Sequence, residues 1–240
     1  MVAHYDSHNL TWLSLKDGHV EKTIGKYYGN GQGQFNSPRG VSFDPQQGHL
    51  WVADYYNDRV QLFNEDGQFI RLFRCCQYPS SVAFLSNGDV VIASRSDHKL
   101  HVYSPEGGLR RSIGAFGEPC QLAVVPPAAP GEEDHLAVAD SHYSNKCVHI
   151  VSSTDGHVVR TLKTAGKPRG VVVTPDQYVI AVEYDPDCVE VFSPEGERVH
   201  QWGGTRGSAP GQFADPYHCT LLSDGRVAIA DYDNRRIQIF

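Results

Sequence analysis

The sequence predicts an all-β protein built from repeated units. One pattern, a short apolar strand followed by a polar loop and a second strand, recurs six times at intervals of roughly 40 to 50 residues. Around each copy, apolar and polar residues alternate in short runs bounded by Gly, Pro and Asp, as in half-buried strands. Short-stranded units of this length pack face to face, so we expect a six-bladed β-propeller. The copies begin at Val2, Val52, Ile92, Val138, Ala181 and Ile229.

Each unit is expected to form one four-stranded antiparallel blade. In the second unit, strands a to d span 39–44, 49–54, 59–64 and 68–73. Strands c and d are joined by Asp-Gly or Glu-Gly in five units, where glycine accepts the positive φ of a tight hairpin turn. The predicted blades span residues 1–25, 38–73, 79–113, 119–162, 168–202 and 216–240.

The first and last units are each one strand short. Residues 1–25 supply strands b, c and d, and the residues from Tyr217 onward supply strands a, b and c. The chain therefore supplies 22 of the 24 strands of six complete blades. A blade without its first strand has an unpaired sheet edge, so we expect residues 1–240 to be a single propeller domain of a longer protein.

The composition is that of a globular protein, with 40% hydrophobic residues, 20% charged residues and a net charge of −7. No run of apolar residues is long enough for a membrane span, and no basic segment followed by an apolar one opens the chain. The six cysteines form no Cys-x-x-Cys pair, which argues against a structural zinc site. We expect free thiols, a cytoplasmic location, no cofactor, no membrane contact and no small-molecule substrate.

Two units share an Asp-x-x-Asn-x-Arg spacing at the end of strand b. An aspartate there accepts hydrogen bonds in the b-to-c loop, and an arginine five residues on can bridge to a neighbouring segment. We therefore predict a structural role for these residues. They are Asp54, Asn57 and Arg59 in the second unit, and Asp231, Asn234 and Arg236 in the sixth. The other units depart from the pattern; for example, Cys147 and Cys188 replace the arginine in the fourth and fifth.

Residues 31–67, GQGQFNSPRGVSFDPQQGHLWVADYYNDRVQLFNEDG, resemble the NHL repeat. Residues 207–240, GSAPGQFADPYHCTLLSDGRVAIADYDNRRIQIF, are similar to it as well, and the resemblance extends over essentially the whole chain. The patterns of WD40 and kelch repeats are absent. The resemblance implies the C-terminal NHL domain of a tripartite-motif (RING, B-box and coiled-coil) protein. In such ubiquitin ligases the NHL domain binds substrate proteins or RNA.

One rim of the predicted propeller is rich in tyrosine, arginine and histidine. Because successive strands alternate in direction, the d-to-a and b-to-c loops emerge on one rim, and the a-to-b and c-to-d loops emerge on the other, acidic rim. Tyrosine and arginine dominate binding hot spots, and Tyr5 and Tyr184 also belong to this rim. The predicted partner-binding residues are Arg39, Tyr55, Tyr56, Arg74, Tyr78, Arg95, His142, Arg169, Tyr217, His218, Tyr232 and Arg235.

Arg39 and Arg169 follow the proline before strand a in matching Pro-Arg-Gly segments. Two interpretations remain open for them. They bind a phosphate or carboxylate of a ligand, or they pair with neighbouring aspartates.

Three functions fit the sequence. The first is a non-catalytic recognition or scaffold module that binds a protein partner through the Tyr/Arg rim, as the substrate-recognition end of a ubiquitin ligase. The second is binding of single-stranded RNA by the same rim, although a strongly basic surface is missing. The third is a metal-dependent lyase or lactonase, as in some related six-bladed propellers. The residues after the prolines are Arg39, Ser80, Cys120, Arg169 and Tyr217, with His218 alone beside them. A metal needs three or more histidine or carboxylate ligands, so we predict no metal site and no catalytic residue.

Overall fold

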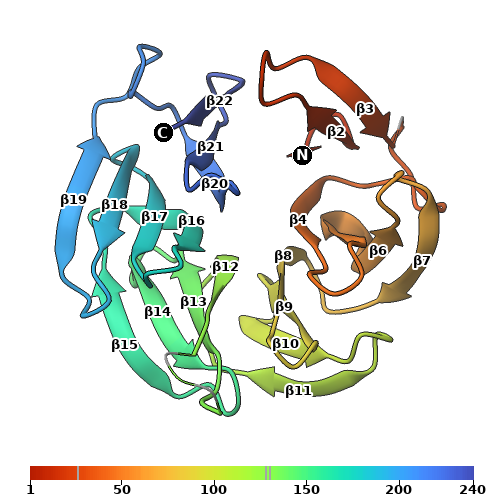
Figure 1. Cartoon of the computed structure of the whole chain (residues 1–240), viewed down its shortest axis with the longest axis horizontal. Helices are drawn as coiled ribbons and strands as arrows, with labels where there is room; N and C mark the ends of the chain where they lie inside the picture. Colours follow the sequence, from red (N-terminus) through yellow and green to blue (C-terminus); the bar gives the residue numbers. More distant parts are fainter. Residues whose placement is uncertain (26, 128, 130) are drawn as a thin grey trace. The chain divides into compact units, whose positions relative to one another are not determined.

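The computed structural model describes residues 1–25, 27–127, 129 and 131–240. Among these residues, 22 strands form six antiparallel sheets, and the helical content is a single turn of 3-10 helix, η1 (Tyr55–Asn57) (Figure 1). Four sheets contain four strands, and the first and last contain three. The predicted all-β, six-bladed β-propeller is confirmed, with its strand order and its two short sheets.

The chain divides into two compact units, of which unit 1 spans Met1–Ser112. Unit 1 contains three sheets, and in each sheet consecutive strands pair as neighbours. Its strands are β1 (Val2–His4), β2 (Asn9–Leu13), β3 (Val20–Ile24), β4 (Pro38–Phe43), β5 (Leu50–Asp54), β6 (Arg59–Phe63), β7 (Phe69–Arg74), β8 (Pro79–Phe84), β9 (Val90–Ser94), β10 (Lys99–Tyr103) and β11 (Leu109–Ile113).

Unit 2 spans Ile113–Phe240 and contains the other three sheets, with the same consecutive strand order. Its strands are β12 (Pro119–Val125), β13 (His135–Asp140), β14 (Cys147–Ser152), β15 (Val158–Lys163), β16 (Lys167–Val173), β17 (Val179–Tyr184), β18 (Cys188–Phe192), β19 (Arg198–Gly203), β20 (Pro216–Leu221), β21 (Val227–Asp231) and β22 (Arg236–Ile239).

The hydrophobic core of each unit lies between neighbouring sheets. In unit 1, Val52 of β5 packs in one cluster with Leu10 of the first sheet. The preceding residue, Trp51, packs in a second cluster with Val82 of the third sheet. Successive side chains of a strand point to opposite faces, so β5 is buried on both sides. Burial of each such large side chain contributes roughly 1.5–3 kcal/mol.

Strand β17 of unit 2 is buried in the same way. Ala181 packs toward the fourth sheet together with Val148. Its neighbour Val182 packs toward the sixth sheet together with Ile229. The middle sheet of each unit is therefore covered on both faces by its two neighbours, as expected for stacked blades.

The first strand of the middle sheet in each unit has an irregular register just after its proline. Between Pro38 and Val41, β4 advances by three residues while the partner strand β5 advances by two. An extra residue of this kind bends a strand and redirects a side chain. Arg39 lies in this irregularity, and Arg169 lies in the equivalent irregularity of β16.

No helix in the described part of the chain is long and apolar enough to cross a membrane. All six cysteines are free thiols.

Candidate functional site

Five residues from the three sheets of unit 1 form a cluster, called the unit 1 cluster: Tyr5, Arg39, Tyr55, Tyr56 and Tyr78. The guanidinium carbon of Arg39 lies 3.7 Å from the centre of the Tyr55 ring and 5.0 Å from that of Tyr5. Tyr55 stacks on Tyr78 with ring centres 5.1 Å apart. Tyr56 meets both of these rings nearly at right angles. The Tyr5 and Tyr56 hydroxyls are hydrogen-bonded at 2.9 Å, and this bond, followed by burial, raises the pKa of Tyr56.

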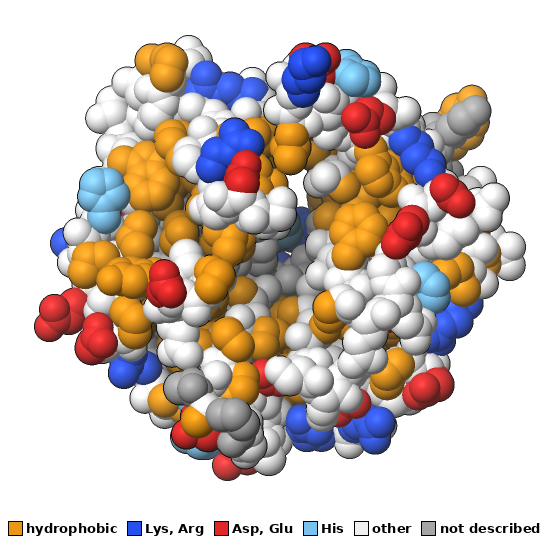
Figure 2. Space-filling model, viewed as in Figure 1, with side chains coloured by type: hydrophobic (Ala, Val, Ile, Leu, Met, Phe, Trp, Pro, Cys, Tyr) orange, Lys and Arg blue, Asp and Glu red, His pale blue; other side chains and the backbone are white. Residues whose placement is uncertain are grey.

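The unit 1 cluster has a buried base and an exposed edge. Tyr55 is only 6% exposed, whereas Tyr56 and Tyr78 are 46% and 40% exposed. Tyr78 has a φ of 49°, which is unusual for a residue other than glycine. Its backbone N–H donates to the Asp58 carboxylate at 3.0 Å, which fixes this conformation. Side chains of the hydrophobic class, which includes tyrosine, gather over β4 to β6 on the face seen in Figure 2.

Unit 2 contains a related cluster, called the unit 2 cluster: Arg169, Tyr184, Asp215, Tyr217 and Tyr232. The Arg169 guanidinium carbon lies 4.4 Å from the centre of the Tyr184 ring and 4.9 Å from that of Tyr217. It also forms an ion pair with Asp215 at 2.7 Å. Burial raises the pKa of Asp215, and Arg169 opposes that rise. Of the two interpretations of the Pro-Arg-Gly arginines, pairing with an aspartate therefore holds for Arg169.

A charged network continues from the unit 2 cluster. The buried Asp187 carboxylate accepts the backbone N–H of Asp215 at 3.0 Å and a hydrogen bond from Arg206 at 3.1 Å. Arg206 also pairs with Asp233. Beside this network is a cavity of about 350 Å³, which is lined by Tyr184, Asp185, Pro186, Asp187, Gly204 and Arg206. The sequence did not single out Asp187 or Asp215, because neither belongs to a repeated motif.

The remaining predicted partner-binding residues lie outside the two clusters or at their edges. Arg74 and Arg235 are exposed, and neither forms an ion pair with another described residue. The backbone N–H of Arg95 donates to the Tyr78 carbonyl at 3.2 Å. The His142 ring packs on Tyr143, and the His218 ring packs on Tyr217 in the unit 2 cluster.

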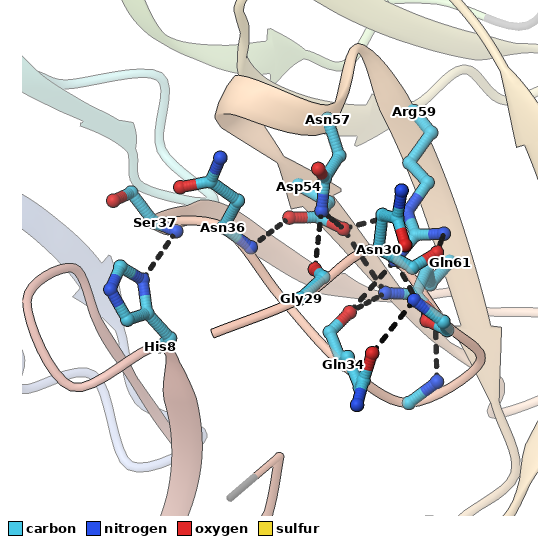
Figure 3. A network of polar contacts seen from close by, with 12 residues as sticks. His8, Gly29, Asn30, Gln34, Asn36, Ser37, Asp54, Asn57, Arg59 and Gln61 are labelled. Atoms are coloured by element: carbon cyan, nitrogen blue, oxygen red, sulfur yellow. Dashed lines mark hydrogen bonds and ion pairs between the residues drawn. The ribbon is translucent and has the colours of Figure 1, made fainter. Parts of the chain in front are cut away.

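The Asp-x-x-Asn-x-Arg residues of the second sheet form a buried polar network (Figure 3). Asp54 is fully buried, and its Oδ1 accepts the backbone N–H of Asn36 at 2.7 Å. Its Oδ2 accepts hydrogen bonds from Asn57 at 2.9 Å and from Arg59 Nε at 2.7 Å. This carboxylate therefore joins the turn after β5 and strand β6 to the connector before β4.

The rest of the Arg59 guanidinium holds residues 30–34 of the connector between β3 and β4. Its carbonyls need donors, and Arg59 donates to three of them at 2.5 to 2.9 Å. Gln61 adds a bond to the Gln34 carbonyl at 2.6 Å. The carbonyls bound by Arg59 belong to Asn30, Gly31 and Gln34.

The sixth sheet repeats this network. Asp231 Oδ2 accepts from Asn234 at 2.9 Å and from Arg236 at 2.7 Å. Gln238 donates to the Gln212 carbonyl at 2.8 Å, as Gln61 does to Gln34. In both sheets a glutamine follows the arginine by two residues. This repeated glutamine could have identified Gln61 and Gln238 from the sequence, but the Asp-x-x-Asn-x-Arg motif ends before them.

The fourth sheet has a buried aspartate, Asp140, at the equivalent position but no arginine beside it. Cys147 occupies the arginine position, and His149 Nε2 lies 3.7 Å from Asp140 Oδ2. The neighbouring Asp140 carboxylate raises the pKa of His149 to about 9. Although burial opposes it, the neighbouring His149 and hydrogen bonds from two backbone N–H groups hold the pKa of Asp140 well below its ordinary value. A histidine thus lies beside the carboxylate here, as an arginine does in the second sheet.

Among the described residues, no three His, Cys, Asp or Glu side chains are grouped so that they could bind a metal ion.

The family model of the NHL repeat matches residues 35–63, which contain Asp54, Asn57, Arg59 and Gln61. These residues therefore contain an NHL repeat, within a chain that folds as a six-bladed β-propeller. Its fold is similar to that of the solved "Streptogramin B lyase structure", with a TM-score of 0.68, 14% identity and coverage of 98% of this chain and 72% of that chain. At this identity the likeness concerns the fold.

Three curated relatives are similar to parts of this chain. Protein brain tumor of Drosophila melanogaster is 35% identical over 37% of the chain. Peptidyl-glycine alpha-amidating monooxygenase B of Xenopus laevis is 38% identical over 31%. NHL repeat-containing protein 3 of Homo sapiens is 37% identical over 47%. The aligned stretches cover only 9%, 9% and 32% of these relatives, respectively.

Proposed function

We propose that this propeller is a non-catalytic recognition module that binds a protein partner through the loops of its Tyr/Arg rim. The observation that carries the proposal is the pair of Tyr/Arg clusters. In each unit an arginine in the same strand irregularity lies on tyrosine rings from adjacent sheets. Such rings offer large contact area with polar hydroxyl tips, and truncating them at interfaces has large effects on affinity.

The geometry of the unit 1 cluster supports recognition over simple packing. Arg39 and the buried Tyr55 form a rigid base, so Tyr56 and Tyr78 lose little further conformational entropy when a partner covers them. Their exposed rings are separate from the acidic turns that join the outer strands. Within longer proteins of the NHL family, we infer that this module is the substrate-recognition end of a ubiquitin ligase. The six free thiols support a cytoplasmic setting.

Single-stranded RNA is the second candidate ligand, because exposed tyrosine faces also stack nucleic-acid bases. The charge around the clusters favours a protein. Arg169 is paired with Asp215, and Arg206 is paired with Asp187 and Asp233, so these cations are partly neutralised before any phosphate binds. A titration with a randomised single-stranded RNA pool at several salt concentrations separates the two ligands, since phosphate contacts make binding strongly salt-dependent.

Site-specific photocrosslinking tests the proposal directly. A benzophenone amino acid replaces Tyr56 in one version of the protein and Tyr178 in a control. Tyr178 is similarly exposed, at 39% against 46%, but lies in the turn between β16 and β17, on the acidic rim. We expect the Tyr56 version to crosslink to a protein partner, and Arg39→Glu to reduce the yield at least tenfold, whereas the Tyr178 version stays uncrosslinked. Equal yields from both positions, or crosslinks to RNA, would contradict the proposal.

A further inference from the structure

The fifth sheet holds two buried carboxyl groups side by side. Glu183 at the end of β17 and Glu190 in β18 are both fully buried. The N–H of Gly166 donates to Glu183 Oε2 at 2.5 Å, and the N–H of Ala165 donates to Glu190 Oε2 at 3.1 Å. These two amides are consecutive in the connector between β15 and β16. The two glutamate side chains therefore bind adjacent residues of that connector.

In the second sheet, the residues at the equivalent positions carry one negative and one positive charge. Strand pairing places Glu183, Cys188 and Glu190 where the second sheet has Asp54, Arg59 and Gln61. The change from arginine to cysteine removes a positive charge, and the change from glutamine to glutamate adds a negative one. The fifth sheet therefore needs another way to neutralise its carboxyl groups.

Among the described residues, one cation contacts this pair: Arg198 of β19 donates to Glu190 Oε1 at 2.5 Å. From β18 the Cys188 thiol also faces Glu183, and its pKa is raised by burial and by both glutamates. The charged groups of β16, Lys167 and Arg169, lie over the Tyr184 ring. Among the titratable residues of β20, His218 packs on Tyr217, and burial raises the pKa of the Cys219 thiol.

Two carboxylates in a buried site with a single arginine cannot both ionise near neutral pH. Glu190 bonds Arg198, and although burial opposes it, its bonds with Glu183 and Arg198 lower its pKa. Glu183 Oε1 is buried and accepts no hydrogen bond from the described residues. Burial, followed by the neighbouring Glu190, raises the pKa of Glu183 to about 9. The proton of the pair therefore belongs on Glu183.

We propose that Glu183 is a proton-dependent lock on the connector that runs from Thr164 to Lys167. In its neutral form it lies against Glu190 and binds the Gly166 amide, and loss of its proton drives the two side chains apart and frees the connector. That connector leads into β16 and so into the arginine of the unit 2 cluster. The lock makes this end of unit 2 sensitive to alkaline pH.

The sign of the effect follows from proton binding. The ordinary pKa of a glutamate is 4.5, and that of folded Glu183 is about 9. Between these values the folded state binds one proton more than the unfolded state, so stability falls as pH rises. The contribution of Glu183 is fully present below about pH 4.5 and is lost as pH rises through about 9. Over this window the folding constant changes by about tenfold per pH unit.

Urea unfolding of the wild type and of Glu183→Gln between about pH 5.5 and 8.5 tests the lock. Glutamine keeps the shape and carries no titrating proton. We expect the ratio of the wild-type folding constant to that of Glu183→Gln to fall by about tenfold per pH unit. The control Glu197→Gln changes an exposed glutamate of the adjacent turn and should follow the wild type. Parallel pH profiles for wild type and Glu183→Gln would overturn the proposal.

A second measurement needs no variant. In wild-type protein with 13C-labelled glutamate carboxyl groups, the Glu183 resonance should stay at the protonated position at pH 7 and titrate near pH 9, while the Gly166 amide loses hydrogen-exchange protection over the same range. A Glu183 resonance that is already ionised at pH 6 would overturn the proposal, whatever the variant does.

Discussion

At the scale of single residues, arginine serves two purposes in this chain. Arg59 is buried, and it donates one hydrogen bond to Asp54 and three to carbonyls of the β3–β4 connector. Arg39 and Arg169 are partly exposed and lie on tyrosine faces. Burial decides the difference, because a desolvated guanidinium must be fully hydrogen-bonded, whereas one at the surface can remain available to a partner.

The two copies of the Asp–Arg pair give a prediction about stability. Arg59→Met leaves the fully buried Asp54 carboxylate without its cation, and we expect a loss of about 3–5 kcal/mol in the free energy of unfolding. Arg236→Met should lose less, because the Arg236 side chain is 30% exposed against 7% for Arg59 and water reaches the remaining carboxylate more easily. Urea unfolding measures both changes. An equal or larger loss for Arg236→Met would refute this account of the network.

At the scale of elements, the strands were predictable because their apolar alternation and their Asp-Gly or Glu-Gly turns are local signals. In the second sheet the predicted strand ends lie within one residue of β4 to β7. The turn η1 and the register irregularity after each proline were not predictable, because they depend on hydrogen bonds from other segments. These features place Arg39 beside Tyr55, so the sequence indicated the members of the cluster but not their contacts.

Close packing between first strands gives a prediction at this scale. A Cβ added to Gly40 of β4 would lie 2.6 Å from Ser81 Cα of β8, so backbone would have to move. We expect Gly40→Ala to lose about 1–3 kcal/mol by overpacking. Gly108→Ala is the matched control, since its Cβ would meet only Ser104 Oγ at 3.4 Å, and its effect should stay within about 0.5 kcal/mol. Thermal or urea unfolding distinguishes the two; a neutral Gly40→Ala would contradict the packing argument.

The repeat explains which features of the candidate site could be predicted from the sequence and which could not. Strand alternation assigns Tyr55, Tyr78 and Tyr217 to one rim before any coordinates exist. It does not say that Arg169 pairs with Asp215, because that contact joins a strand irregularity to a connector of the next sheet. Nor does it show that Glu183 meets Glu190, which follows only once strand register sets their positions.

At the scale of the whole molecule, the residues that recur in each unit specify the β-propeller. The residues that differ between units give each sheet its own charges and contacts. Asp–Arg pairs hold the second and sixth sheets, whereas cysteine replaces the arginine in the fourth and fifth, where His149 lies beside Asp140 and Glu183 lies beside Glu190. We propose that the Tyr/Arg clusters of the two units are the features that this scaffold presents to a partner.

Hydrogen–deuterium exchange of the protein, alone and in complex with the crosslinked partner after its purification, tests the recognition claim most directly. We expect new protection in residues 55–58 and 76–79 of unit 1 and in 184–187 and 215–218 of unit 2, with the turns at 64–68 and 193–197 unchanged. Protection confined to those turns, with the cluster segments exchanging as in the free protein, would contradict the claim that the Tyr/Arg rim binds the partner.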